Sequence, residues 1–293
     1  MRTLKLKAPA KVNLYLQVLK RRPDGFHDIE TIFEKIDLCD TITLKKLNTP
    51  GIELFCSAGL AQDNRNLAYQ AAQAIFQNTG CEQGVELRIT KRIPVAAGLG
   101  GGSSDAASVL LGLNRLFSFG LSKKQLAKLA EQLGADVPFF IFPGARAIGR
   151  GKGEDLTTLR LNKKYWYILV IPRPIKVSTR KMYQSLRIAL TKRASRAKIV
   201  LQALKKSDLT SLNKNSYNSF ESVLVKKYRQ ILVIKKALQS SGCAATLVSG
   251  SGPCVFGVTQ TRKEAAEISK SLRAKSKNWQ VITCKTFSSV KNM

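Results

Sequence analysis

The chain has 293 residues, 44% of them hydrophobic, which is enough for a substantial core and favours about two domains. It contains no apolar run of about 18 residues and no uninterrupted apolar segment behind its basic N-terminus, so we expect neither a transmembrane helix nor a signal peptide. The six cysteines are scattered, and only one histidine is present. This composition argues against a zinc site and against a disulfide framework, and it favours a reducing, cytoplasmic location.

The net charge of +30 is unevenly distributed along the chain. No acidic residue occurs between Asp155 and Asp208, and residues 151–293 hold 29 of the 49 Lys and Arg. Such a charge is typical of nucleic-acid-binding proteins, but it also fits a solvated basic surface. Aromatic residues are not interleaved with these charges, which favours the solvated surface. We therefore expect no membrane partner and no specific nucleic-acid partner, and at most non-specific polyanion binding.

In the first half of the chain, alternating apolar residues predict strands near 3–8, 11–19, 28–37, 41–46 and 52–56. A helix is predicted at 66–78, and a further strand at 84–92. The next helix begins at Ser103 or Ser104 and runs to about Phe117. Another covers 123–133, with Ser122 as its N-cap and Gly134 as its terminator. Two short elements follow, an apolar one that begins at Asp136 and a strand at 145–148.

In the second half, a buried strand is predicted at 165–172. Helical patterns follow at 178–189, 194–206, 216–224 and 228–240. The rest is predicted as a hairpin over 245–258, an amphipathic helix at 261–275 and a final strand at 279–287. This order predicts an α+β, ferredoxin-like arrangement. We place the domain boundary within 149–164, which gives domains of residues 1–158 and 159–293.

A glycine-rich segment, IPVAAGLGGGSSDAA (93–107), lies between a predicted strand and a predicted helix. It matches neither a Walker A motif nor a dinucleotide fingerprint, whose third glycine is replaced by Ser103. Closely spaced glycines leave backbone N–H groups unobstructed, and the first turn of a helix carries unpaired N–H groups and a partial positive charge. The segment therefore predicts a polyphosphate site, where Ser103 and Ser104 cap the helix or reach a phosphate or its metal. A merely flexible turn is the alternative, although four glycines exceed what a turn requires.

This segment resembles the phosphate-binding motif of the GHMP kinases, named for galactokinase, homoserine kinase, mevalonate kinase and phosphomevalonate kinase. KAPAKVNLYL (7–16) resembles the N-terminal motif of the family, and VSGSGPCVFG (248–257) its C-terminal glycine motif. The triple glycine, DGFHDIETIF (24–33) and LGADVPFF (133–140) are similar to members that act on a cytidine diphosphate derivative of methylerythritol. The resemblance covers essentially the whole chain and is weakest between about 185 and 235.

The resemblance implies a two-domain GHMP kinase fold, with an N-terminal domain similar to ribosomal protein S5 and a ferredoxin-like C-terminal domain. It implies ATP-dependent phosphorylation of the 2-hydroxyl of that small-molecule substrate, in the non-mevalonate pathway to isopentenyl diphosphate. ATP and Mg²⁺ are the implied cofactors, but no acidic cluster is evident and no metal ligand is assigned. A homoserine- or mevalonate-type kinase remains an alternative. Another is a basic nucleic-acid-binding protein with an S5-like fold and an incidental glycine loop.

Phosphoryl transfer needs charge stabilisation, alignment and removal of the proton of the acceptor hydroxyl. By resemblance, Asp136 is the general base and Lys11 is the active-site lysine that keeps it ionised. The alternative for Asp136 is a helix N-cap, although the surrounding GADVP motif favours the base. From the residues alone, Lys11 would ordinarily be a solvated strand residue.

The resemblance also implies the binding residues. ATP binding is assigned to Pro94, Val95, Ala96, Ala97, Gly98, Leu99, Gly100, Gly101, Gly102, Ser103 and Ser104. Substrate binding is assigned to Asn13, Phe26, His27, Tyr183, Gly250 and Ser251. In this assignment His27 contacts the cytosine edge, and Phe26 and Tyr183 stack on the ring. A lone histidine is also often structural, and the 249–252 segment could simply be a hairpin turn.

Overall fold

The structure is a computed structural model that describes every residue except 1–2, 58, 174, 187–193 and 289–293. Contacts along the backbone divide the chain into two units. The first comprises Met1–Ala10, Leu38–Val95 and Gly100–Pro143. The second comprises Lys11–Asp37, Ala96–Leu99 and Gly144–Met293. The two units share the long strands near the N-terminus.

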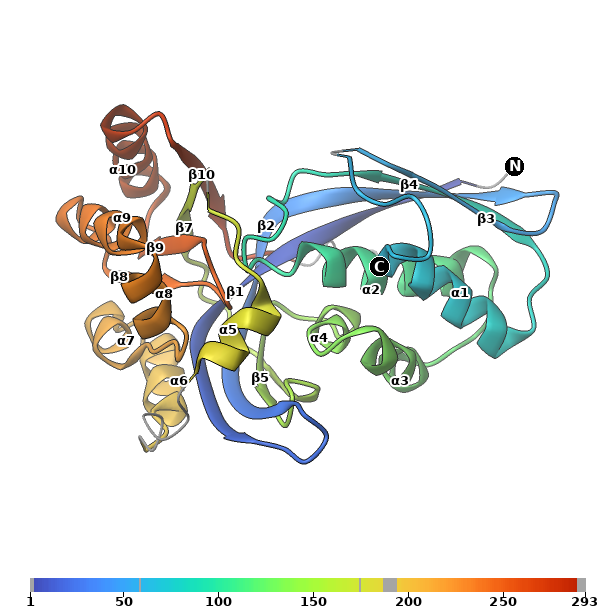
Figure 1. The fold of residues 1–293 in the computed structure, drawn as a ribbon, viewed down its shortest axis with the longest axis horizontal. Helices are drawn as coiled ribbons and strands as arrows, with labels where there is room; N and C mark the ends of the chain where they lie inside the picture. The colour runs from blue at the N-terminus through green and yellow to red at the C-terminus, as the bar shows by residue number, and fades with distance from the viewer. Residues whose placement is uncertain (1–2, 58, 174, 187–193, 289–293) are drawn as a thin grey trace. The chain divides into compact units, whose positions relative to one another are not determined.

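The described residues form mixed helices and strands, as the α+β prediction requires (Figure 1). The strands are β1 (Thr3–Arg21), β2 (His27–Leu47), β3 (Ile52–Cys56), β4 (Gly84–Thr90), β5 (Arg146–Arg150), β6 (Asp155–Leu159), β7 (Trp166–Pro172), β8 (Ala245–Val248), β9 (Val255–Thr259) and β10 (Trp279–Lys285). The helices are α1 (Leu67–Thr79), α2 (Gly101–Leu116), α3 (Lys123–Leu133), α4 (Val137–Ile141), α5 (Thr179–Ser185), α6 (Ala197–Lys206), α7 (Leu209–Asn215), α8 (Glu221–Lys227), α9 (Arg229–Ser240) and α10 (Arg262–Lys275). Among them, no helix is long and apolar enough to cross a membrane.

Two pairs of predicted strands are in fact single long strands. The strands expected near 3–8 and 11–19 are one strand, β1, which continues through Pro9. Among the described strands, β1 pairs with β2, and its one further bridge, from Leu16 to Asn218, lies away from Pro9. At Pro9 it is therefore an edge strand, where a proline is tolerated. The strands expected near 28–37 and 41–46 are likewise one strand, β2. Asp40 interrupts its apolar pattern but not the strand, because its buried carboxylate accepts backbone N–H groups from a neighbouring segment.

The helix after the glycine-rich segment begins earlier than predicted. Helix α2 begins at Gly101, with Gly100 as its N-cap at φ 69°, a conformation that favours glycine. No side chain caps this helix, so a capping role for Ser103 or Ser104 was a wrong prediction. By contrast, the predicted cap of α3 is confirmed, because Ser122 forms a capping box with Gln125.

Several further boundaries differ from the predictions. Strand β6 and helix α7 were missed, and α8 begins at Glu221 rather than near 216. Helix α7 is capped by the Asp208 side chain, which accepts the N–H of Ser211 at 2.9 Å. The part of the helix predicted over 178–189 that follows residue 186 lies outside the described residues. The predicted domain boundary falls within β6 and stays a prediction.

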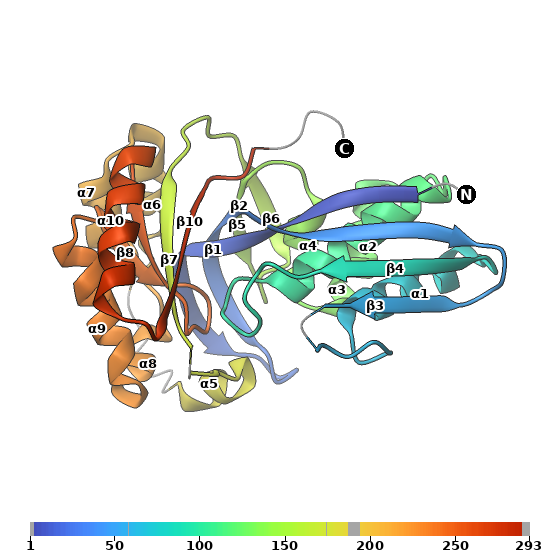
Figure 2. The ribbon, with the colours of Figure 1, turned by 90° about the horizontal axis from the view of Figure 1, so that it is seen from above.

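In the first unit, one sheet is covered by helices on a single face. Strand β4 pairs with β2 in antiparallel fashion and with β3 in parallel fashion. Helices α1, α2 and α3 lie on one side of these strands (Figures 1 and 2). Helix α2 packs closely on the sheet at Gly112, where an added Cβ would overlap Leu44 and lie 2.8 Å from Leu6. This close approach holds the C-terminal half of α2 against the sheet.

In the second unit, a four-stranded sheet has the order β10-β7-β9-β8, and all its pairs are antiparallel. Helix α10 connects β9 to β10, and helices α5–α9 lie between β7 and β8 along the chain. Helices α9 and α10 pack on one face of the sheet (Figure 1). This is the ferredoxin-like order predicted for the second half.

A buried ion pair joins β2 and β5 in the second unit. Arg146 donates from Nε and Nη2 to the two carboxylate oxygens of Glu34, at 2.5 and 2.9 Å. The hydroxyl of Thr286 donates to the same carboxylate at 2.5 Å. The side chains of Arg146 and Glu34 are 1% and 0% exposed. Because both charges are desolvated, each depends on the other for compensation.

We predict that Arg146→Met lowers the free energy of unfolding by about 3–5 kcal/mol, because it leaves the Glu34 charge buried without its partner. The matched control is Arg150→Met on the same strand, where the ion pair with Glu30 involves a half-exposed arginine. That change should cost at most about 1 kcal/mol. Urea denaturation of both variants measures the difference, and equal small losses would contradict this prediction.

Candidate active site

Lys11 and Asn13 lie side by side on β1 and are both buried, at 4% and 2% exposure. The Lys11 ammonium donates to Asn13 Oδ1 at 2.7 Å, and Asn13 Nδ2 donates to Thr31 Oγ1 at 2.9 Å. The chain of hydrogen bonds ends where Thr31 Oγ1 donates to the carbonyl of Tyr15 at 2.7 Å. The interpretation of Lys11 as a solvated strand residue was therefore wrong. A buried ammonium needs polar partners, and Asn13 is one that the sequence places two residues away on the same face.

Residues 97–99 of the glycine loop are hydrogen-bonded on both sides within the second unit. The backbone N–H of Lys11 donates to the carbonyl of Leu99 at 2.9 Å, and that of Cys254 donates to the carbonyl of Ala97 at 3.2 Å. The Ser249 hydroxyl donates to the carbonyl of Gly98 at 2.9 Å. The loop is thus held between the N-terminal strand and the C-terminal glycine segment.

Close backbone contact explains why glycine occupies two of these positions. Gly98 has φ 77°, and an added Cβ would overlap the carbonyl oxygen of Ser249 and lie 3.0 Å from the nitrogen of Gly252. A Cβ at Gly250 would lie 3.1 Å from the Gly98 oxygen and 3.3 Å from Lys11 Nζ. The 249–252 segment is therefore more than a hairpin turn, because it packs directly against the glycine loop and Lys11.

Asn218 supports this C-terminal segment and was missed by the sequence analysis. Its side-chain amide donates to the carbonyls of Val248 and Gly250, both at 2.8 Å, and the side chain is 3% exposed. Nearby, the hydroxyls of Ser251 and Thr179 are 2.8 Å apart. Asn218 precedes a short helix, a position where asparagine is usually a local cap, so its sequence context gave no signal of this longer-range role.

The N-terminal turn of α2 presents backbone rather than side-chain groups. Its first intrahelical bond joins Ser104 N–H to the carbonyl of Gly100 at 2.9 Å. The earlier N–H groups of a helix have no intrahelical acceptor, so they are available to an anion. Ser104 is fully buried, and its hydroxyl has no hydrogen-bond partner among the described residues. Val95 in the preceding loop is 55% exposed, and Ala96 has φ 54°.

The second unit brings His27 and Tyr183 together. Their rings are stacked with centroids 4.9 Å apart, and Tyr183 meets Phe220 edge-on at 4.8 Å. Burial, and to a smaller extent the charge of Arg21, lower the pKa of His27, so the imidazole is neutral at pH 7. Phe26 is 56% exposed, with the ammonium of Lys152 at 4.9 Å from its ring centroid. Tyr183 therefore contacts His27 and Phe26 contacts Lys152, and stacking of Phe26 and Tyr183 on a cytosine ring stays a prediction.

Asp136 lies in the first unit, between the Gly134 end of α3 and the buried helix α4. It occupies the N-cap position of α4, but its side chain makes no capping hydrogen bond. The simple N-cap interpretation therefore does not account for this aspartate. Because Asp136 and Lys11 belong to different units, their joint action stays a prediction.

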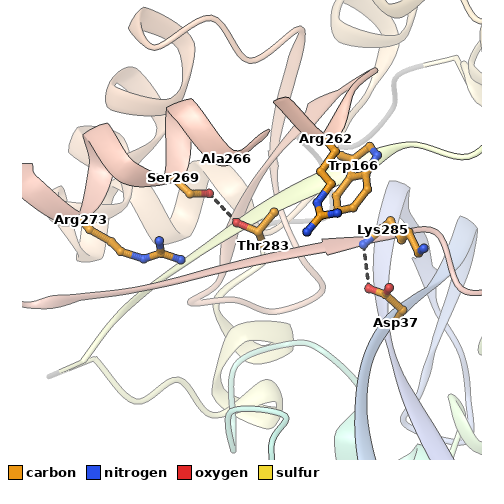
Figure 3. Close-up of a pocket in the computed structure, with 8 residues that line it drawn as sticks. All are labelled: Asp37, Trp166, Arg262, Ala266, Ser269, Arg273, Thr283 and Lys285. Carbon is orange, nitrogen blue, oxygen red and sulfur yellow. Dashed lines mark hydrogen bonds between the residues drawn. The ribbon is translucent and has the colours of Figure 1, made fainter. Parts of the chain in front are cut away.

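A separate groove of about 500 Å³ lies against α10, β7 and β10 (Figure 3). It is lined by Asp37, Trp166, Arg262, Ala266, Ser269, Arg273, Thr283 and Lys285. None of the predicted site residues is among them. The lining includes three cationic side chains, those of Arg262, Arg273 and Lys285, and one carboxylate, that of Asp37, which accepts the backbone N–H of Lys285 at 2.8 Å. The groove belongs to the basic half of the chain, for which non-specific polyanion binding stays a prediction.

We predict that Gly98→Ala destabilises the protein more than Gly120→Ala does. Both glycines have positive φ, but nothing lies within 4 Å of a Cβ at Gly120. That variant should therefore lose only the about 1–2 kcal/mol expected for a left-handed alanine. Gly98→Ala adds the overlap with Ser249, which costs about 1–3 kcal/mol more. Chemical denaturation of the two variants measures the difference in the free energy of unfolding. Equal losses would show that the 249–252 segment moves away from an added Cβ at little cost.

Two family models match the chain: the GHMP kinases N terminal domain over residues 66–144 and the GHMP kinases C terminal model over residues 200–278. Among similar proteins, a 4-diphosphocytidyl-2-C-methyl-D-erythritol kinase of Geobacter metallireducens is 43% identical, covering 96% of this chain and 98% of the relative. A kinase of the same name from Gloeobacter violaceus is 37% identical, covering 98% of this chain and 95% of the relative.

Solved structures agree with these matches. A crystal structure of 4-(cytidine 5'-diphospho)-2C-methyl-D-erythritol kinase has a TM-score of 0.83 at 32% identity, covering 97% of this chain and all of that one. A homoserine kinase from Cytophaga hutchinsonii, at 19% identity and a TM-score of 0.74, covers 98% of this chain and 95% of that one and shares the fold. The chain therefore belongs to the GHMP kinases and, among them, to the 4-diphosphocytidyl-2-C-methyl-D-erythritol kinases.

Proposed function

We propose that this protein transfers the γ-phosphoryl group of ATP to the 2-hydroxyl of 4-diphosphocytidyl-2-C-methyl-D-erythritol. This reaction belongs to the non-mevalonate pathway to isopentenyl diphosphate, and we assign it to the cytoplasm. One observation carries the proposal: Lys11, the glycine loop and the C-terminal glycine segment converge in a single hydrogen-bonded cluster. The names of relatives about 40% identical over nearly the whole chain support the choice of substrate.

ATP binding is assigned to the glycine loop and the first turn of α2, residues 94–104. Backbone N–H groups at a helix N-terminus suit phosphate oxygens, because they combine free donors with the partial positive charge of the helix. The positive φ values at Gly98 and Gly100 support this assignment, since they turn the backbone while leaving no side chain in the way of the phosphates.

For the chemical step we assign Asp136 as general base and Lys11 as the electrostatic partner. Asp136 would accept the proton of the 2-hydroxyl as its oxygen forms a bond to the γ-phosphorus. The bond from that phosphorus to the bridging oxygen breaks, and ADP leaves with the electron pair. The Lys11 ammonium would offset negative charge that develops on these oxygens. Its hydrogen bond to Asn13 supports this role, because it restricts an otherwise flexible side chain.

The cytosine base is assigned to His27 and its aromatic neighbours. A neutral imidazole has one donor and one acceptor nitrogen, which can match the donor and acceptor groups of a cytosine edge. The lowered pKa of His27 supports this assignment because it keeps the ring neutral. Tyr183 and Phe26 are the candidates for stacking on the base. Gly250 and Ser251 are assigned to the substrate through their backbone, next to Lys11.

Mg²⁺ is the implied metal, and its coordination is assigned mainly to ATP. Among the described residues, no group of three or more His, Cys, Asp or Glu side chains is arranged to hold a metal ion. Mg²⁺ commonly binds through substrate phosphates and water with few protein ligands. On the phosphates it would neutralise charge during transfer. We assign it no protein ligand.

ADP release with three acceptors tests the proposed function. The purified protein is given ATP and, in turn, the cytidine diphosphate substrate, homoserine and mevalonate. We expect turnover only with the cytidine compound, with phosphate found on its 2-oxygen by ³¹P NMR. Turnover of homoserine or mevalonate instead would establish one of the alternative kinase types. No turnover with any acceptor would contradict the proposal.

We predict that Asp136→Asn reduces the rate of phosphoryl transfer by about two to four orders of magnitude, the range of general acid–base catalysis. The amide has nearly the same shape as the carboxylate but cannot accept the proton. The dissociation constant of ATP should stay within about twofold, because the side chain acts on the acceptor. Single-turnover rates and ATP binding measure the two effects separately, and an unchanged rate would remove Asp136 from the mechanism.

We predict that His27→Ala raises KM for the cytidine substrate by at least about tenfold, because base atoms are left without hydrogen-bond partners. KM for ATP should change little. Tyr183→Phe is the matched control, since it keeps a ring in contact with His27 while removing the hydroxyl. Steady-state kinetics with each substrate varied in turn give both constants. An equal rise in the two KM values would mean that His27 is structural.

A further inference from the structure

A buried three-residue charge cluster lies beneath the N-terminal turn of α2 in the first unit. The Lys91 ammonium donates to Asp105 Oδ2 at 2.6 Å and also to Asp40 Oδ2. The Lys91 side chain is 5% exposed, and those of Asp40 and Asp105 are 0% and 5% exposed. Three elements thus meet in one place: β2 supplies Asp40, the segment after β4 supplies Lys91, and α2 supplies Asp105.

The cluster also fixes the backbone that enters the glycine loop. The second oxygen of Asp40 accepts the N–H groups of Arg92 at 2.5 Å and Ile93 at 2.9 Å. Ile93 is buried, and it lies directly against the first residue of α2. A Cβ at Gly101 would be 3.1 Å from Ile93 Cγ2 and 3.3 Å from Lys91 Nζ. The position of the α2 N-terminus is therefore set by contacts with Lys91 and Ile93.

Burying three charged side chains costs free energy of desolvation, and a helix can begin without such a cluster. Buried charges are tolerated only when they are paired and hydrogen-bonded, and replacing them with apolar residues often leaves a protein as stable or more stable. Two carboxylates also face a single ammonium. Burial raises the pKa of Asp105 to about 7, and Asp40 acts in the same direction.

We propose that Asp40, Lys91 and Asp105 are positioning residues for nucleotide binding, which hold the first turn of α2 where its N–H groups meet the phosphates of ATP. The proposal rests on the proposed function for the identity of the nucleotide. None of the three residues is among those assigned to the cytidine substrate, so the cluster should act on the affinity for ATP and leave the affinity for that substrate unchanged. A purely structural cluster would lower the folding stability and would not weaken ATP binding more than binding of the cytidine substrate.

The test compares Asp105→Ala with Asp105→Asn. The alanine variant removes the acceptor of the Lys91 ammonium on α2. The asparagine variant keeps the shape and a carbonyl oxygen that accepts the same hydrogen bond. Ser108→Ala is the matched control, because Ser108 is a buried polar residue of the same helix outside the cluster. Thermal melting of each variant establishes that it is folded at the assay temperature. If Asp105→Ala is not folded, Asp105→Ser replaces it, since its hydroxyl is too short to reach Lys91.

Binding of a non-hydrolysable ATP analogue with Mg²⁺ is measured by calorimetry in the absence of acceptor. We expect Asp105→Ala to weaken this binding by at least about tenfold, the size expected for removing one charge-assisted hydrogen bond. Asp105→Asn and Ser108→Ala should stay within about twofold of the unchanged protein. The affinity for the cytidine substrate, measured in the same way, should stay within about twofold in all three variants.

Three results would overturn the proposal: unchanged ATP binding in a folded Asp105→Ala variant, equal weakening of both ligands, or an asparagine variant as weak as the alanine variant. Analogue binding is measured without turnover, so a failure of the proposed function can be distinguished from a failure of the positioning proposal. In that case the unchanged protein would bind the analogue but release no ADP with the cytidine substrate.

Discussion

The contact of one bare backbone segment with another determines much of the second unit. At Gly98 the chain has positive φ and lies so close to Ser249 that no side chain fits between them. The hydrogen bonds from Lys11 and Cys254 to the carbonyls of Leu99 and Ala97 hold the loop on both sides. Segments that are far apart in the sequence thereby become one support, because backbone groups can approach most closely where Cβ atoms are missing.

This support explains how an ammonium group can be buried near the N-terminus of the chain. Lys11 is held by Asn13, and Gly250 leaves space for its Nζ atom. Asn218 in turn fixes the carbonyls of Val248 and Gly250 from behind. Each of these polar groups is hydrogen-bonded, as a buried polar network requires if it is to be rigid rather than destabilising. Electrostatic stabilisation of phosphoryl transfer needs a rigid cation, and Lys11 lies beside the segment that we propose to bind phosphate.

Local patterns predicted the architecture well, and long-range contacts explain the remainder. The order of strands and helices in the second half was sufficient for the ferredoxin-like sheet, and the Ser122 cap of α3 was read directly from the sequence. The continuity of β1 through Pro9 could not be predicted from the sequence, because it depends on β1 being an edge strand at that point. The start of α2 at Gly101 was also missed, since the helix is positioned by Ile93 and Lys91 rather than by a side-chain cap.

In the candidate site, too, local motifs could be recognised in the sequence but long-range contacts could not. The motifs singled out Lys11, His27 and the two glycine segments, whose roles stay predictions. The structure shows the ring of Tyr183 stacked on that of His27, whereas stacking of Tyr183 on the cytosine ring stays a prediction. Asn218 and the Lys91 cluster could not be found in this way. Asp40 and Lys91 are 51 positions apart, and each alone resembles an ordinary charged residue near a strand end. Only the fold reveals that they are buried and paired.

The most direct test of the central claim is amide hydrogen exchange of Lys11 and Cys254 in the free protein and in Gly98→Ala. These two N–H groups donate to the glycine loop from opposite sides, so both should exchange slowly in the unchanged protein. In the variant both should exchange faster together, while the Leu87 amide on β4 in the other unit keeps its rate. If the two amides respond independently, or neither changes, the glycine loop and the C-terminal glycine segment are not the single support described above.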